Sequence, residues 1–191
     1  NQKESDYCGG YSSSSVSEDK ESTELCPVFS FAAAKWIQGD KNSYGTDLRS
    51  IGRGHKNIGA LPVSECPHCK LDGYFDPRWR DLNSWPKESL EIAKVYKKKS
   101  FIWADKGRYD IFDNIRTALW QFKNEMRSVV TGVGWRANWT SAPGGVIPKD
   151  VGQVVSGHAI KVVLGQKIIN GEPHLIVQNS YGKDIGDKGL F

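Results

Sequence analysis

A pair of strand-like segments near the C-terminal end constrains the fold more than any other feature of the sequence. Residues 155–164 and 175–182 each carry apolar residues over the length of a strand, and residues 169–173 between them, Ile-Asn-Gly-Glu-Pro, are typical of a turn. The two segments therefore predict a β-hairpin, in which the start of one strand lies beside the end of the next. His158 stands near the start of the first strand and Asn179 at the end of the second. We expect these two side chains to be neighbours.

A histidine held by an amide oxygen is a useful base, because the amide fixes the orientation of the ring and leaves the other nitrogen available for proton transfer. The candidate nucleophile for such a base is Cys8, which opens the segment 7–18. This segment is rich in Gly and Ser, which are poor helix formers, but small side chains suit a buried helix whose start Asp6 would cap. The positive end of that helix would lower the pKa of the Cys8 thiol. The same composition also fits a flexible linker, and both interpretations stay open.

Helical patterns dominate the first half of the chain and strand patterns the second. The predicted helices cover residues 25–37, 48–55, 86–94 and 110–122, and the predicted strands besides the hairpin cover residues 100–104 and 128–135. This order predicts an α+β fold with two lobes, a helical one from about residue 1 to 95 and a strand-rich one from about residue 96 to 191.

Composition excludes several classes of function. The net charge of +4 is mild, and the one basic cluster, Lys97–Lys99, is interpreted as a solvated face, so no nucleic acid partner is expected. No apolar run approaches the roughly 20 residues of a membrane span. Cys66 and Cys69 form half of a zinc site, but no second pair follows at a standard spacing. Loop stapling or plain thiols are therefore expected there, and a zinc-stapled interaction domain is the weaker alternative.

The order of the polar candidates resembles the papain-like cysteine peptidases. In that family a glutamine, a cysteine at a helix start, a histidine and an asparagine form one site, and Gln2, Cys8, His158 and Asn179 follow in the same order. The closing segment 178–191 resembles the Asn-Ser-Trp-Gly tract of the family and the Gly-x-x-Gly-aromatic pattern after it. The resemblance spans nearly the whole chain, because residues 25–29 and 44–49 also look like helix starts of bacterial and viral members.

The resemblance implies a two-lobe fold, with a helical left lobe and an antiparallel β-barrel-like right lobe, and an endopeptidase acting on peptide or protein substrates without metal or organic cofactor. It implies that the thiolate of Cys8 attacks, that His158 exchanges protons with it, and that Asn179 orients the imidazole. Gln2 and the backbone N–H of Cys8 would form the oxyanion hole. Tyr181, where the family carries Trp, would shield the hydrogen bond between His158 and Asn179 from water.

The sequence also departs from the family pattern. Gly9 replaces an aromatic residue after the nucleophile and alters the packing beneath the site, and Gly157 replaces the common Asp before the histidine. Ser5 stands where many secreted members carry a disulfide-bonded cysteine, which fits a reducing compartment. The chain starts seven residues before Cys8 and ends where the family continues with a last barrel strand, so we expect a piece of a longer polypeptide or a minimal member. These departures support a second hypothesis, a catalytically silent papain-like module that binds peptide or serves a larger assembly.

Overall fold

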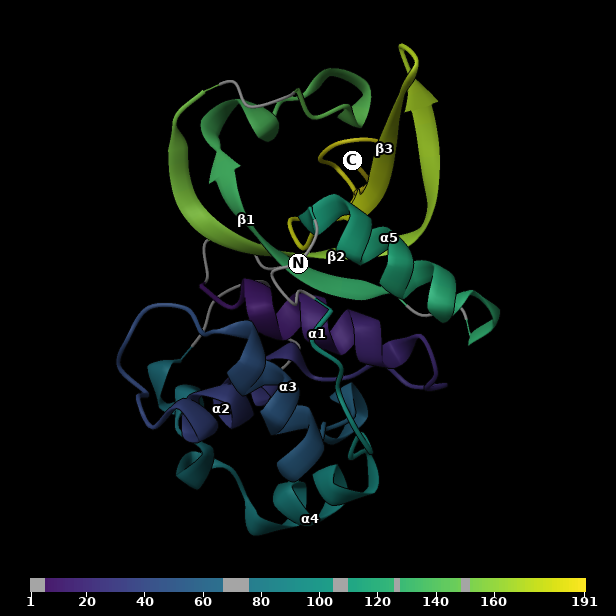
Figure 1. The fold of residues 1–191 in the computed structure, drawn as a ribbon. Helices are drawn as coiled ribbons and strands as arrows, with labels where there is room; N and C mark the ends of the chain where they lie inside the picture. The colour runs from purple at the N-terminus through teal and green to yellow at the C-terminus, as the bar shows by residue number, and fades with distance from the viewer. Residues whose placement is uncertain (1–5, 67–75, 105–109, 126–127, 149–151) are drawn as a thin grey trace. The chain divides into compact units, whose positions relative to one another are not determined.

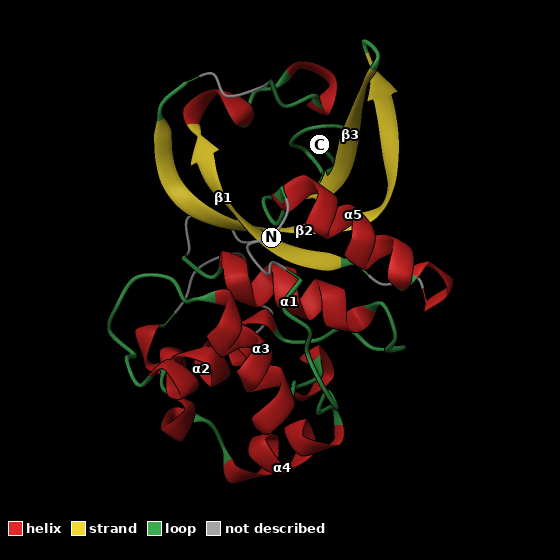
Figure 2. Cartoon of the chain, in the orientation of Figure 1, coloured by secondary structure: helices red, strands yellow, loops and turns green. Residues whose placement is uncertain are grey.

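The protein is described by a computed structural model that covers residues 6–66, 76–104, 110–125, 128–148 and 152–191. The chain divides into two compact units, Asn1–Phe101 and Ile102–Phe191, and each is described by itself. The fold class is α+β, as the sequence predicts: the described α-helices precede an antiparallel sheet (Figures 1 and 2).

The first unit is helical. Its α-helices are α1 (Cys8–Glu18), α2 (Pro27–Gln38), α3 (Leu48–Asn57) and α4 (Lys87–Val95), and its 3-10 helices are η1 (Val63–Glu65), η3 (Pro77–Arg80) and η4 (Leu82–Ser84). The ends of these helices follow local chemistry. Pro27 stands in the first turn of α2, and Gly39, with a φ of 75°, ends it. The Asp47 carboxylate caps α3 by accepting a hydrogen bond from the Ser50 N–H at 2.8 Å.

Tertiary packing makes a helix of the glycine- and serine-rich segment, so the flexible-linker interpretation is wrong. A Cβ at Gly9 would clash with the side chain of Ile51 on α3, and a Cβ at Gly10 with the backbone carbonyl of Pro27 on α2. The hydroxyls of Ser14 and Ser30 meet at 2.9 Å between α1 and α2. Small side chains therefore let α1 lie close to two other helices, and this burial offsets the poor intrinsic helix propensity of the segment.

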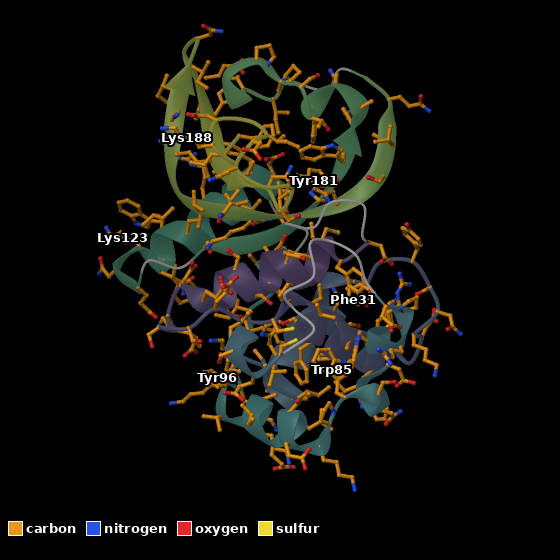
Figure 3. All side chains as sticks on the ribbon, turned by 180° about the vertical axis from the view of Figure 1, so that it is seen from behind. Phe31, Trp85, Tyr96, Lys123, Tyr181 and Lys188 are labelled. Carbon is orange, nitrogen blue, oxygen red and sulfur yellow. The ribbon has the colours of Figure 1, made fainter. Side chains whose placement is uncertain are left out.

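The core of the first unit surrounds α2. Phe29 lies edge-to-face on Trp85, and Trp79 lies edge-to-face on the same ring (Figure 3 labels Trp85). The indole N–H of Trp85 donates to the backbone oxygen of Trp79 at 3.1 Å, so its only polar atom is satisfied inside the core. The buried members of this core are Cys26, Val28, Phe29, Ala32, Leu61, Cys66, Trp79, Leu82, Trp85 and Ala93.

Two sulfur atoms meet in this core. The Sγ atoms of Cys26 and Cys66 lie 3.2 Å apart, and both side chains are fully buried. Cys69, the other cysteine of the Cys-x-x-Cys pair, lies outside the described residues. Among the described residues, no group of three or more His, Cys, Asp or Glu side chains has the geometry to hold a metal ion.

The predicted strand at residues 100–104 is wrong, because the described part of this segment pairs with no other strand. Its aromatic content has another role. The ring of Phe101 lies so close to Gly52 on α3 that a Cβ there would come within 2.8 Å of it. The segment is thus anchored by a side chain rather than by a backbone ladder.

The second unit contains α5 (Ile111–Gln121) and three strands, β1 (Val129–Arg136), β2 (Val154–Ile169) and β3 (Glu172–Gln178), joined in the order β1-β2-β3. Both pairings are antiparallel, and the hairpin of β2 and β3 turns at Asn170 and Gly171, which both have positive φ. The sheet of the described residues is open, so the barrel-like closure expected for this half is not confirmed. The buried core between α5 and the sheet consists of Ile115, Leu119, Trp135, Ile160, Val162 and Val177.

Within the described residues, no helix is both long enough and apolar enough to cross a membrane.

Candidate active site

The hairpin brings His158 and Asn179 together. His158 lies on β2 and Asn179 follows the last residue of β3, and the antiparallel register pairs Lys161 with Gln178 next to them. The Nε2 atom of His158 lies 3.0 Å from Oδ1 of Asn179, and both side chains are buried. The backbone N–H of Asn179 donates to the oxygen of Gly189 at 3.1 Å, which holds the residue where the strand ends. The amide oxygen is thus placed to accept a hydrogen bond from the ring N–H at Nε2 and to fix the ring.

Two aromatic side chains cover the imidazole. The ring of Tyr181 stacks on the ring of His158 with centroids 4.9 Å apart and an angle of 8° between the planes (Figure 3 labels Tyr181). The ring of Trp135 lies edge-to-face on the same imidazole, with centroids 5.0 Å apart. Trp135 also lies edge-to-face on Tyr181, with centroids 5.7 Å apart. The Trp135 N–H donates to the Thr140 hydroxyl at 3.2 Å, so the indole is held at both ends. Aromatic rings therefore cover the His158 imidazole on two sides.

Trp135 was not among the residues singled out from the sequence. It lies opposite Ser156 in the pairing of β1 with β2. Because Ser156 is two positions from His158, Trp135 and His158 lie on the same face of the sheet. The period of two in a strand would have pointed to it, but only if the strand that pairs with the hairpin, and its register, had been known.

The surroundings of His158 set its protonation. Burial lowers the pKa of the ring below its ordinary value, and the hydrogen bond with Asn179 opposes that shift. A lowered pKa keeps the imidazole neutral near pH 7, which is the form that accepts a proton. The Nδ2 atom of Asn179 is buried and has no hydrogen-bond partner among the described residues, so the amide is held through its oxygen.

Cys8 is the first residue of α1, in the first unit, and its side chain is partly exposed. The thiol is thus at the positive end of the helix, where thiolate is favoured. Tyr7, the cap residue of α1, makes no side-chain capping hydrogen bond. Gln2, the expected oxyanion donor, lies outside the described residues, so its role stays a prediction. His158, Asn179 and Tyr181 belong to the second unit, so their meeting with Cys8 also stays a prediction.

The two glycines that depart from the family pattern differ in their surroundings. At Gly9 the space that a side chain would need is filled by the end of the Ile51 side chain, so a larger residue there would require that side chain to move. At Gly157 a Cβ would meet no atom of the described residues within 4 Å, so these residues leave room for a side chain beside His158. Packing explains the first departure, and nothing in the structure explains the second.

The sequence matches no family model. The structure, however, resembles solved proteases over nearly its whole length. It matches xylellain, a cysteine protease from Xylella fastidiosa, with a TM-score of 0.68 and 20% identity, covering 97% of this chain and 71% of that one. It matches digestive procathepsin L 3 of Tenebrio molitor larval midgut with a TM-score of 0.66 and 16% identity, covering 100% and 58% of the two chains. The protein has the papain-like fold.

A third match supports the same fold. The bromelain protease from Ananas comosus, solved with the E64 inhibitor, gives a TM-score of 0.62 at 16% identity and is covered over 80% of its chain. This chain spans 71% of the length of xylellain but less than two thirds of the length of procathepsin L 3. At such identities the likeness concerns the fold, and the chemistry has to be argued from the residues.

Proposed function

We propose that this protein is a papain-like cysteine endopeptidase that hydrolyses peptide bonds in peptide or protein substrates. The observation that carries the proposal is the buried hydrogen bond between Nε2 of His158 and Oδ1 of Asn179. It occurs in a chain with the papain-like fold, in which Cys8 opens a helix. One ring nitrogen is thereby engaged by an amide, and the other is left for a thiol.

In the proposed reaction, Nδ1 of His158 takes the proton of the Cys8 thiol. The thiolate then attacks the carbonyl carbon of the substrate and forms a carbon–sulfur bond. The protonated imidazole gives its proton to the leaving amine as the carbon–nitrogen bond breaks, which leaves a thioester on Cys8. Water, deprotonated by the same imidazole, attacks the thioester, the carbon–sulfur bond breaks, and the thiol is restored.

The remaining residues have supporting roles in this scheme. Asn179 keeps the imidazole in the plane that serves both proton transfers. Tyr181, stacked on the ring, keeps water from the hydrogen bond between His158 and Asn179. The side-chain amide of Gln2 and the backbone N–H of Cys8 would donate to the oxyanion of the tetrahedral intermediate. No step requires a metal ion or an organic cofactor.

The test is hydrolysis of a broad peptide library by the full chain, combined with labelling by a thiol-directed epoxide. E64, present in the bromelain structure, is a suitable reagent. We expect hydrolysis by the wild type and its loss in the Cys8→Ala and His158→Ala variants, with unchanged circular dichroism. We also expect one label per chain, on Cys8, at a rate that depends on pH.

His174→Ala is the matched control, because His174 lies on β3 of the same hairpin and pairs with Lys167 at a distance from the site. It should hydrolyse the library like the wild type. Hydrolysis that persists in Cys8→Ala would refute the mechanism. Labelling no faster than that of a small thiol in solution, with no hydrolysis, would favour the silent module.

A further inference from the structure

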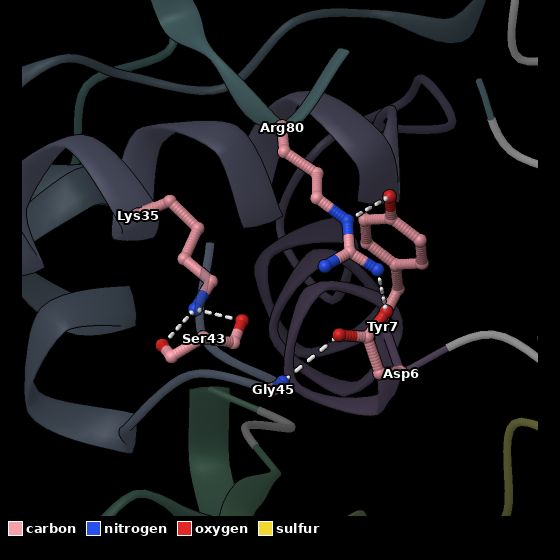
Figure 4. Close-up of polar contacts among 6 residues, drawn as sticks. All are labelled: Asp6, Tyr7, Lys35, Ser43, Gly45 and Arg80. Carbon is pink, nitrogen blue, oxygen red and sulfur yellow. Dashed lines mark hydrogen bonds and ion pairs between the residues drawn. The ribbon is translucent and has the colours of Figure 1, made fainter. Parts of the chain in front are cut away.

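A partly buried ion pair fixes the chain immediately before Cys8. The guanidinium of Arg80 on η3 contacts the Asp6 carboxylate, with Nη2 and Oδ1 2.7 Å apart, and its Nε donates to the Tyr7 hydroxyl at 3.1 Å (Figure 4). The second carboxylate oxygen of Asp6 accepts the backbone N–H of Gly45 at 2.9 Å. We call this set of four residues, Asp6, Tyr7, Gly45 and Arg80, the Asp6–Arg80 clasp.

The clasp is not an ordinary surface ion pair. The side chain of Asp6 is only 3% exposed and that of Arg80 21%. Tyr7 is buried, with its ring edge-to-face on Phe31 of α2 at 4.2 Å and the Arg80 guanidinium 5.4 Å from its centroid. A carboxylate so far from water is stable as an anion only when a charge partner and hydrogen bonds replace its hydration. Both oxygens of Asp6 have such partners.

The position of the clasp gives it a consequence for α1. The helix has a weak intrinsic propensity and no side-chain cap, so its first residue is not fixed by local chemistry. Arg80 is 74 residues from Asp6 in sequence, and it ties the residues before Cys8 to η3. The Gly45 N–H ties the same residues to the loop before α3. The start of α1 is thus held from two other segments.

Charge gives the clasp a second consequence. Asp6 is two residues before Cys8, and a carboxylate without a partner at that place would oppose formation of a thiolate. Arg80 supplies one positive charge at 2.7 Å from the carboxylate, so the pair is close to neutral at a short distance. The helix start then keeps the full benefit of its positive end.

We propose that Arg80 is a positioning residue for Cys8. Through Asp6 and Tyr7 it holds the start of α1 in place, and it cancels the Asp6 charge so that the thiol ionises readily. This inference rests on the proposed function in taking Cys8 as the nucleophile. Other charged groups surround this end of the first unit. They stay unchanged in every variant below, so their effects cancel when the thiol pKa of a variant is compared with that of the wild type. They are Lys35 on α2, Asp40 after α2, Asp47 at the start of α3 and Asp76 before η3.

The experiment measures the rate of alkylation of Cys8 by iodoacetamide against pH in the full chain, with the modified residue located by peptide mapping. It is repeated in the His158→Ala background, which removes any contribution of the imidazole. In Arg80→Gln the carboxylate loses its partner, and we expect the pKa of the Cys8 thiol to rise by about 1, with alkylation below that pKa slower by about tenfold.

Three further variants separate charge from shape. Asp6→Asn removes the charge and keeps a hydrogen-bond acceptor for Gly45, so we expect the thiol pKa to stay or fall. The double variant Asp6→Asn/Arg80→Gln restores neutrality, so its thiol pKa should return to within about 0.3 of the wild-type value. Arg80→Lys keeps the charge but loses the planar fork, so the thiol pKa should change little while peptide hydrolysis falls about threefold to tenfold.

Arg78→Gln is the matched control. Arg78 is on the same η3 helix, but its side chain is 63% exposed and pairs with Asp76 at the surface. It should leave the thiol pKa and hydrolysis unchanged. If Arg80→Gln does not fold by circular dichroism, the other two variants carry the test: the thiol pKa should not rise in Asp6→Asn, and in Arg80→Lys hydrolysis should fall while the thiol pKa stays near the wild-type value.

The inference is wrong if Asp6→Asn, Arg80→Gln and the double variant all raise the thiol pKa alike, since that pattern would indicate only a damaged helix start. It is also wrong if Arg80→Gln behaves like Arg78→Gln. These results are independent of peptidase activity. A wild type that hydrolyses no peptide but shows the expected alkylation pattern would remove the proposed function and keep the role of Arg80 toward the thiol. Normal peptide hydrolysis by the wild type, with the same thiol pKa in all variants, would keep the proposed function and remove the role of Arg80.

Discussion

Two buried histidines, one in each unit, show how equal burial can accompany different hydrogen bonding. His55 on α3 and His158 on β2 are each 5% exposed. His55 has a hydroxyl on each ring nitrogen, with Ser17 Oγ 3.2 Å from Nδ1 and Ser13 Oγ 3.2 Å from Nε2. His158 has an amide on Nε2 alone among the described residues of its unit, and aromatic rings around it.

The difference lies in what each ring has left to do. Burial, with a smaller effect of the Lys98 charge, lowers the pKa of His55 to about 4, so it stays neutral with both nitrogens engaged between α3 and α1. Such a ring joins two helices and has no nitrogen to offer a reactant. His158 also has a lowered pKa, but one nitrogen is not engaged by its own unit. An unused hydrogen-bonding atom, rather than burial or a shifted pKa, separates a candidate base from a structural histidine.

Two single variants, each with one of these histidines replaced by glutamine, give the strongest test of this distinction. His158→Gln removes the proton carrier, so we expect peptide hydrolysis to fall by at least about 10³-fold while the thermal midpoint changes little. His55→Gln leaves the proposed chemistry intact but disturbs buried hydrogen bonds, so we expect a loss of about 1 to 3 kcal/mol of unfolding free energy. Its kcat at 10 °C should stay within about threefold of the wild-type value. Loss of hydrolysis in a well-folded His55→Gln chain would show that the distinction is false.

Acid should expose the role of His55. Its pKa is about 4 in the folded protein and 6.5 in the unfolded chain, so between these values the unfolded state binds more protons. The neutral ring therefore contributes its full stability above pH 6.5, and that stability is lost as pH falls toward 4. A difference of about 2.5 in pKa corresponds to roughly 3 kcal/mol.

Urea unfolding at pH 7, 5.5 and 4 would measure this contribution. The wild type should lose roughly 3 kcal/mol more than His55→Gln over that range, because the other titrating groups are common to both chains and cancel. An equal loss in the two chains would mean that His55 is not the group that senses acid.

How much of the fold and of the candidate site can be predicted from the sequence depends on how far apart in the chain the residues that determine each feature lie. The hairpin that joins His158 to Asn179 and the start of α3 at Leu48 are set within a few residues, and the sequence predicts both. For α1 the sequence leaves helix and linker open, since contacts with Pro27 and Ile51 favour the helix.

Features that depend on long-range pairing could not be predicted. The Asp6–Arg80 clasp joins residues 74 apart, and neither residue has a local signal for the other. The same holds for Trp135, whose place beside His158 follows from the register of β1 on β2. A strand was expected at residues 100–104 because the aromatic run fits one, whereas the ring of Phe101 is used to pack against α3.

The smallest effect we expect concerns Trp135, which the comparison of the two histidines identifies as part of the apolar surround of His158. Trp135→Leu keeps an apolar side chain but removes the ring edge that contacts His158 and the hydrogen bond to Thr140. Water would reach the imidazole, so the pKa of His158 should rise toward 6.5, and hydrolysis should fall by no more than about tenfold. Proton NMR titration of the imidazole would measure this pKa directly, with or without peptidase activity.

Trp139→Leu is the matched control for that change, because Trp139 lies edge-to-face on Trp135 at 5.5 Å and belongs to the same aromatic group. If Trp135 acts by direct contact with the imidazole, only Trp135→Leu should move the pKa of His158. If the two variants move it equally, the aromatic group acts as ordinary core, and the contrast with the hydroxyl-bound His55 then rests on Asn179 and the unused nitrogen alone.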